Sequence, residues 1–126
     1  MTVITLLVYI ASSLALNIKR ILKLSNKVGC FMSHHAVWND ALSKGYKRVM
    51  ILEDDAAFVL GFMRKLKTRM MELENVQWDF LYLARSKVFR DAAEEDVPMT
   101  DNWVHPSFST WTLHYVVSDT GKLLAA

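Results

Sequence analysis

Three consecutive acidic residues, Glu53, Asp54 and Asp55, directly follow an apolar run from Val49 to Leu52. A buried strand ordinarily carries no charge at its end, so carboxylates in this position indicate that something binds there. Carboxylate oxygens suit hard divalent cations such as Mg²⁺ or Mn²⁺, which in turn hold a phosphate or diphosphate. Glu53 and Asp55 are two residues apart, so on an extended chain they would point to the same side.

The same three residues also fit a solvated turn after a strand, with Asp55 as the N-cap of the segment that follows. Three acids in a row have no ligand spacing as specific as that of paired Cys-x-x-Cys motifs. Spacing alone therefore leaves both interpretations open.

Helical and extended patterns alternate along the chain, and this alternation predicts an α/β layer fold with a largely parallel sheet. Ligands of such sheets bind beyond the carboxyl ends of the strands, which is where the acidic trio falls. The segment from Arg90 to Ser109 is expected to be a loop. The expected helices are Ser33 to Ser43, ended by Gly45, then Gly61 to Glu74 and a last one beginning in Asp119 to Ala126, and the expected strands are Arg48 to Leu52, Asp79 to Leu83 and His114 to Val117.

Length and composition predict one domain, since 126 residues of 52% hydrophobic content can bury a core. A formal net charge of +2 argues against nucleic acid as a partner. The basic residues between Arg64 and Arg69 are typical of a solvated helix face. The single cysteine, Cys30, permits no internal disulfide and is expected to be a small buried residue, not a nucleophile.

The first seventeen residues, Met1 to Asn17, contain no charged side chain. They are typical of a signal peptide or of a membrane anchor, with Lys19 and Arg20 as its flank. A buried strand or helix that replaces an amino-terminal part of the domain is the alternative.

Four ordered blocks resemble glycosyltransferase family 25, the group that contains collagen galactosyltransferases and lipooligosaccharide galactosyltransferases. The resemblance covers residues 22–126, and the animal collagen galactosyltransferase branch looks closest. Relatives usually have glycine where this chain has Ala84, and they carry an earlier strand and a later acidic segment that are absent here, so the chain resembles an internal piece of a catalytic domain. The blocks are Gly29 to His35 with Trp38, Gly45 to Phe58, Trp78 to Arg85, and Ser109 to Ser118 with Gly121 to Leu124.

This resemblance implies an incomplete GT-A-like nucleotide-diphospho-sugar transferase fold, with a mostly parallel sheet and flanking helices. The acidic trio would act as the family's Asp-x-Asp motif, with Glu53 and Asp55 as ligands of Mn²⁺ and with Asp54 and Asp55 as catalytic residues. The metal would bridge the diphosphate of a UDP-sugar and neutralise the charge that develops on departing UDP.

Further residues are expected to bind substrate. Ser33 and His34 lie in the first block, and one of His34 and His35, which are about 100° apart on a helix, is expected to face the donor sugar or nucleotide. Arg85 is expected to meet a phosphate, with a structural salt bridge as the alternative. Trp111, Thr112 and Tyr115 are expected to line the sugar or acceptor pocket, with core packing as the alternative for the aromatic residues.

The function implied is transfer of a hexose, galactose in the first place, from a UDP-sugar to a hydroxyl acceptor. Hydroxylysine of collagen is the favoured acceptor, ahead of a glycan hydroxyl, and the expected location is the lumen of the endoplasmic reticulum or the secretory pathway. A membrane would be contacted only through an amino-terminal anchor. The alternatives are a non-catalytic binding or adhesion module, an inactive fragment, and a metal-dependent phosphohydrolase, which would lack the second carboxylate cluster of a two-metal site.

Overall fold

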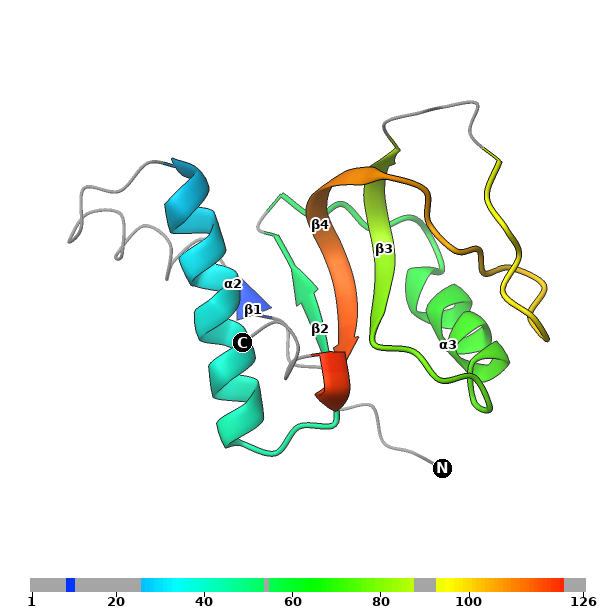
Figure 1. The fold of residues 1–126 in the computed structure, drawn as a ribbon, viewed down its shortest axis with the longest axis horizontal. Coiled ribbons are helices and arrows are strands. Elements are labelled where there is room, and N and C mark those ends of the chain that lie inside the picture. Colours follow the sequence, from blue (N-terminus) through cyan, green and yellow to red (C-terminus); the bar gives the residue numbers. More distant parts are fainter. Residues whose placement is uncertain (1–8, 11–25, 54, 88–92, 122–126) are drawn as a thin grey trace. The chain divides into compact units, whose positions relative to one another are not determined.

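The computed structural model describes residues 9–10, 26–53, 55–87 and 93–121 (Figure 1). They divide into two compact units. Unit 1 comprises the described residues within 1–56, 78–84 and 113–126, and unit 2 those within 57–77 and 85–112.

A four-stranded sheet has the order β1-β2-β4-β3. β1 pairs in parallel with β2, whereas β2 pairs antiparallel with β4 and places Leu52 opposite His114. The arrows of β3 and β4 point in opposite directions in Figure 1. The strands are β1 (Tyr9–Ile10), β2 (Arg48–Leu52), β3 (Phe80–Lys87) and β4 (Ser109–Ser118).

The expectation of a mostly parallel sheet is wrong for β4, which lies antiparallel to β2. If β4 ran parallel to the strand before it, β3, the chain would need a crossover connection between them, which is usually a helix. The described residues 93–108, which lead into β4, contain no helix. The α/β class itself is confirmed, because helices and strands share unit 1.

Helix α2 (Asn26–Ser43) begins seven residues before its expected start at Ser33 and ends where expected. Gly45 follows it with a φ of 68°, in the left-handed region that glycine adopts without strain. The amide of Gly45 donates to the carbonyl of Leu42, and the amide of Tyr46 donates to the carbonyl of Ala41. These two bonds form a Schellman motif, which turns the chain from α2 toward β2.

One face of the sheet in unit 1 packs against α2. Val37 and Ala41 of the helix join alternate residues of β2 and β4 in a single buried cluster. The residues on the other face of β2, Met50 and Leu52, are buried as well. Burial on both faces explains why the strand is a continuous apolar run and not an alternating one.

The start of β3 is fastened to the end of β4 inside unit 1. The Asp79 carbonyl accepts a hydrogen bond from the Ser118 amide, and its carboxylate accepts one from the Thr120 hydroxyl. The guanidinium of Arg48 lies over the Trp78 ring at 5.3 Å. The Trp78-Asp79 pair of the third sequence block therefore has a structural role in this chain.

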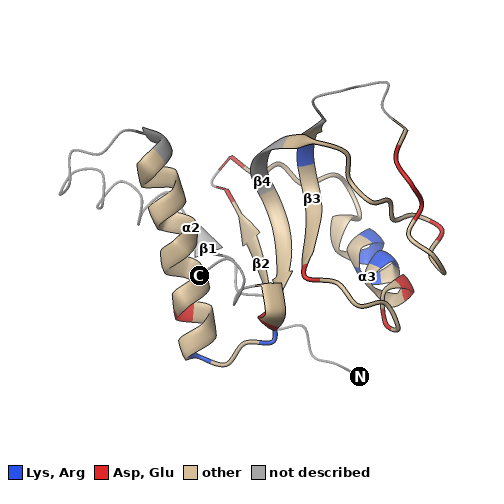
Figure 2. Ribbon diagram, viewed as in Figure 1, with Lys and Arg blue, Asp and Glu red and all other residues tan. Residues whose placement is uncertain are grey.

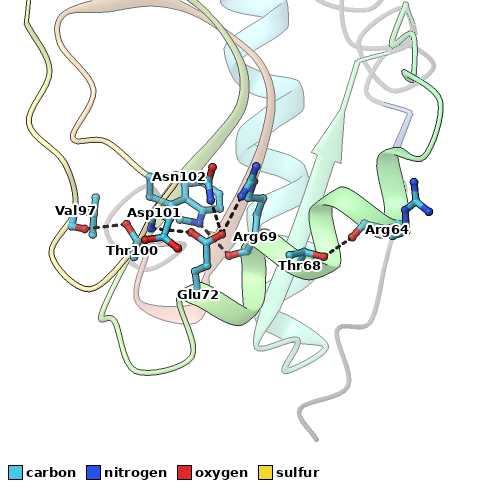
Figure 3. Close-up of polar contacts among 9 residues, drawn as sticks. Arg64, Thr68, Arg69, Glu72, Val97, Thr100, Asp101 and Asn102 are labelled. Atoms are coloured by element: carbon cyan, nitrogen blue, oxygen red, sulfur yellow. Dashed lines mark hydrogen bonds and ion pairs between the residues drawn. The ribbon is translucent and has the colours of Figure 1, made fainter.

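Helix α3 (Phe62–Glu72) is the main helix of unit 2, and its basic residues are exposed as expected (Figure 2). Glu72, at its carboxyl end, forms an ion pair with Arg69 and accepts hydrogen bonds from the Asp101 amide and the Asn102 side chain (Figure 3). The Trp103 indole donates to the Arg69 carbonyl. These contacts fix residues 101–103 to the end of the helix.

Two expectations concern residues that the structure describes only in part. Of the segment 1–17, only Tyr9 and Ile10 are described, and they form β1 beside β2. Residues 119–121 are helical, and the rest of the expected last helix lies outside the described residues. No helix in the described part of the chain combines the length and the apolar character needed to cross a lipid bilayer.

Candidate functional site

Glu53 immediately follows β2 and is held from the neighbouring strand. Its backbone amide donates to Nδ1 of His114, at 3.2 Å. Its side chain is 29% exposed, so the carboxylate lies at the border between the core of unit 1 and solvent. Acidic residues in this segment are visible beyond the β2 arrow in Figure 2.

The chain does not stay extended after Leu52. The Ala56 amide donates to the Glu53 carbonyl, which closes a turn over these residues. Asp55 lies in this turn and is exposed, and it does not cap a helix, because α3 begins at Phe62. The alternation that would place Glu53 and Asp55 on one side of a strand therefore does not apply. Their assignment as metal ligands stays a prediction, and Asp54 lies outside the described residues.

His34 is buried on the face of α2 that meets the sheet, with 5% of its surface exposed. Its Nδ1 lies 2.8 Å from the hydroxyl oxygen of Tyr115, which also accepts a hydrogen bond from the Trp38 indole. Since the hydroxyl accepts from Trp38, its own proton is available for Nδ1 of His34. In the neutral imidazole, Nε2 then carries the hydrogen and faces Oε1 of Glu53 at 3.8 Å.

Burial sets the protonation of this pair. It lowers the pKa of His34, which favours the neutral imidazole. Burial also raises the pKa of Tyr115 far above its ordinary value, so the phenol keeps its proton. Tyr115 has no exposed surface and stacks on Phe80 with the ring centroids 4.6 Å apart. Core packing, the alternative for the aromatic residues of the fourth block, is thus found for Tyr115.

Cys30 precedes His34 by one helical turn on α2. The structure places it at the surface, so the expectation of a buried cysteine is wrong. The stripe that α2 buries includes Ser33, Val37 and Ala41, and Cys30 lies at the edge of this stripe. Ligand atoms of Cys30, His34 and Glu53 all lie within 4.8 Å of one another.

Ser33 and His35, the neighbours of His34, lie apart from this group. Ser33 is buried, and its hydroxyl donates to the carbonyl of Gly29 in the preceding turn, at 2.7 Å. His35 is partly exposed and pairs with Asn39 on the same helix. Of the two histidines, His34 is therefore the one that faces Glu53 at the end of β2. The substrate contact predicted for Ser33 and His34 is a further step that stays a prediction.

Arg85 belongs to unit 2 and is engaged in a polar cluster there. Its guanidinium forms an ion pair with Glu94 and donates to the hydroxyl of Ser109. These contacts match the alternative interpretation of Arg85, a structural salt bridge. The contact between Arg85 and a phosphate stays a prediction. The side chains of Trp111 and Thr112 lie outside the described residues, so their roles also stay predictions.

Glu94 is expected to stabilise unit 2 in a pH-dependent manner. Hydrogen bonds from Arg85 and then from the amide and hydroxyl of Ser107 lower the pKa of Glu94 from 4.5 to about 2. A carboxylate whose pKa is lower in the folded state stabilises that state above about pH 4.5, and this contribution is lost as the pH falls toward about 2. The variant Glu94→Gln should therefore be less stable than the wild type above about pH 4.5, and the difference should shrink in more acidic solution.

Urea unfolding at a series of pH values measures this difference. Glu95→Gln is the matched control, because Glu95 is exposed and adjacent in sequence. Parallel stability curves for Glu94→Gln and the wild type over the whole acidic range would contradict the prediction.

Two partners at this site, Trp38 and His114, were not assigned to it from the sequence. His114 accepts the Glu53 amide hydrogen, and the Trp38 indole donates to the Tyr115 hydroxyl that contacts His34. Trp38 stands in the first resembling block, which was the available signal. His114 had only its expected place in a strand as a signal, and the register that brings it to Glu53 is a property of the folded sheet.

Comparison with known proteins identifies the family. The sequence model of glycosyltransferase family 25, described as LPS biosynthesis protein, matches residues 12–110. The chain belongs to glycosyltransferase family 25. The resemblance inferred from the four sequence blocks is thereby confirmed, and the matched part of this family 25 chain includes Cys30, His34 and Glu53.

Curated relatives of this family 25 chain include proteins named as enzymes and proteins named as inactive. Procollagen galactosyltransferase 1 of Danio rerio is 36% identical over 104 residues, and procollagen galactosyltransferase 2 of Homo sapiens is 34% identical over 104 residues. Inactive glycosyltransferase 25 family member 3 of Mus musculus is 38% identical over 107 residues. Each match covers 79% of this chain and 17% of the relative.

Proposed function

We propose that the chain forms part of the donor site of a galactosyltransferase, which moves galactose from UDP-galactose to a hydroxyl acceptor. The observation that carries the proposal is the family 25 match across β2 and the acidic residues that follow it. Hydroxylysine of collagen is the acceptor proposed first, because the names of several relatives specify procollagen. A glycan hydroxyl is the second.

Mn²⁺ is the cofactor that we propose for Glu53, Asp54 and Asp55. The donor chemistry of the residues fits this ion, because carboxylate oxygens are the ligands that hard divalent cations prefer. Glu53 is partly exposed and Asp55 is exposed, which leaves both carboxylates accessible to a cation from solvent. When bound, the ion would stabilise the negative charge that develops on the diphosphate of the leaving UDP.

Within this proposal the neighbouring residues hold Glu53 in place and orient its carboxylate. His114 fixes the backbone at Glu53 by accepting its amide hydrogen, and the buried His34 faces the Glu53 carboxylate. Asp54 and Asp55 complete the acidic trio next to the diphosphate. Ser33, Arg85, Trp111 and Thr112 are proposed donor or acceptor contacts.

A location in the secretory pathway, in the lumen of the endoplasmic reticulum, belongs to the same proposal. The relatives' names specify procollagen, a precursor form, and the resemblance to collagen galactosyltransferases implies this compartment. The uncharged segment 1–17 would then direct the chain there.

A non-catalytic family member is the second candidate function. It is favoured by the relatives named inactive, which are 37–38% identical to this chain, against 34–38% for the named galactosyltransferases. Identity in this range does not separate the two groups. The chain also spans about 17% of the length of these relatives, so acceptor binding and turnover could depend on parts of the protein outside it.

Calorimetric titration with UDP tests the proposal. The full chain is titrated in Mn²⁺, and again after the metal has been removed with a chelator. Binding that requires Mn²⁺ is the expected result, and it would justify an assay of galactose transfer to a hydroxylysine peptide. A folded sample that binds no UDP in Mn²⁺ would contradict the proposal. Binding without turnover would favour the non-catalytic candidate.

A further inference from the structure

Three side chains of different donor chemistry meet at the end of β2. Cys30 and His34 are four residues apart on α2, so both lie on one face of the helix. Glu53 reaches the same place from the end of the strand. The sulfur, an imidazole nitrogen and a carboxylate oxygen lie within 4.8 Å of one another.

We propose that Cys30, His34 and Glu53 form a binding site for Zn²⁺. A thiolate and an imidazole select zinc-like ions, whereas Mn²⁺ prefers oxygen ligands. Two donors at positions i and i+4 of a helix, with a carboxylate from elsewhere, form a common zinc arrangement. Three protein ligands leave the fourth tetrahedral position to water or to another ligand.

The separations are close to those that a zinc ion requires. Tetrahedral zinc places nitrogen and oxygen donors about 3.3 to 3.5 Å apart and sulfur slightly farther from either. Nε2 of His34 and Oε1 of Glu53 are 3.8 Å apart. Cys30 is at the surface, where its side chain can rotate inward. A contraction of about 1.3 Å or less would bring the three atoms to ligand distance.

The hydrogen bonds of His34 select the nitrogen that would bind the metal. Nδ1 is engaged by the hydroxyl of Tyr115, whose oxygen is in turn fixed by Trp38, so Nε2 is the ligand atom. Metal binding requires Nε2 without its hydrogen, so the ring hydrogen moves to Nδ1 and is donated to the Tyr115 oxygen. In that state the Tyr115 oxygen accepts hydrogen bonds from His34 and from Trp38, and the hydroxyl hydrogen no longer points at Nδ1 of His34. The thiol proton of Cys30 is released to solvent.

This site has a consequence for the donor site that rests on the proposed function. Glu53 would be shared by the two metals, and a nitrogen and sulfur set binds Zn²⁺ more tightly than Mn²⁺. Zn²⁺ would therefore displace Mn²⁺ from Glu53 and weaken the binding of UDP. Cys30→Ser should remove this inhibition and leave the binding of UDP in Mn²⁺ unchanged.

Titration of the full chain with Co²⁺, under reducing conditions, tests the site directly. Co²⁺ replaces Zn²⁺ in such sites, and its bond to a thiolate gives a charge-transfer absorption band that needs no UDP. We expect the band in the wild type, its removal by added Zn²⁺, and its loss in Cys30→Ser. Glu53→Gln and His34→Gln should weaken Co²⁺ binding by more than about 100-fold, because even the outer partners of metal ligands contribute about 10–100-fold.

His35→Gln is the matched control, since His35 is the next residue on the same helix and pairs with Asn39. It should bind Co²⁺ as the wild type does. His34 is buried, so a folding defect in His34→Gln is checked by circular dichroism, and Glu53→Gln then decides at the partly exposed position. Absence of the thiolate band in the folded wild type would overturn the proposal. A band that persists unchanged in Glu53→Gln would also overturn it, whatever the outcome of the UDP titration.

Discussion

Replacing Asp55 by asparagine is expected to abolish the Mn²⁺-dependent binding of UDP and to leave the melting temperature almost unchanged. Asparagine keeps the size of the side chain and removes the negative charge that a hard cation requires. Loss of a metal ligand should weaken UDP binding by at least about 100-fold, which corresponds to about 2.7 kcal/mol. Asp55 is exposed in a turn, and such surface changes usually alter stability by less than about 0.5 kcal/mol.

Calorimetry with UDP in Mn²⁺ and thermal unfolding by circular dichroism measure the two effects separately. Asp101→Asn is the matched control, because Asp101 is an exposed aspartate of unit 2 and lies outside the acidic trio. Equal UDP affinity in Asp55→Asn and the wild type would contradict the assignment of Asp55 as a ligand of Mn²⁺. A large fall in melting temperature would instead show that Asp55 serves the fold.

Replacing Gly121 by alanine is expected to destabilise the chain more than a substitution at any exposed position. A Cβ at residue 121 would overlap the carbonyl oxygen of Asp79 and would lie 2.8 Å from a methyl carbon of Val117. The Asp79 carbonyl is the acceptor for the Ser118 amide, so relief of the overlap would break that bond. The Gly121 amide donates a hydrogen bond to the Ser118 hydroxyl, and a shift of residue 121 would break this buried bond as well. Together, overpacking and a lost buried hydrogen bond cost about 3 kcal/mol.

Thermal unfolding tests this prediction, because about 3 kcal/mol corresponds to a fall of roughly 10 °C in the melting temperature of a domain of this size. Gly45→Ala is the matched control. A Cβ at Gly45 meets no atom within 4 Å, and its cost of about 1 kcal/mol arises from the left-handed backbone alone. If both variants melt at the same temperature, the close approach of residue 121 to Asp79 is contradicted.

The elements at the centre of the chain were predictable because their local signals agree. The apolar run of β2 and the glycine that ends α2 define the strand from Arg48 to Leu52, and the structure has the same bounds. The expected start of α2, at Ser33, lies seven residues after the observed one, and the intervening residues include Gly29, a residue type that disfavours a helix. In the structure Gly29 is buried within α2 and its carbonyl accepts the Ser33 hydroxyl, so local packing outweighs its low propensity.

The contacts around the candidate site could be predicted only in part. The trio at the end of β2 follows from the order of residues, and the first family block contains His34 together with His35. The bond between His34 and Tyr115 joins residues 81 positions apart, and it exists because β4 pairs with β2 in one particular register. An apolar strand pattern specifies neither the direction nor the register of pairing when no short turn links the two strands. Cys30 was predicted to be buried and is exposed. It lies at the edge of the stripe that α2 buries, where the residue type alone does not determine burial.

The pairing of β2 with β4 determines when this sheet can form during synthesis. Glu53 and its partner His114 are 61 residues apart, so a ribosome working at about 5 to 20 residues per second takes about 3 to 12 s to deliver the second strand after the first. Throughout that interval the four buried residues of β2, Val49 to Leu52, lack their antiparallel neighbour. An unpaired apolar strand is a template for pairing with other chains. Until β4 is made, β2 therefore keeps one unpaired edge with which another chain could pair.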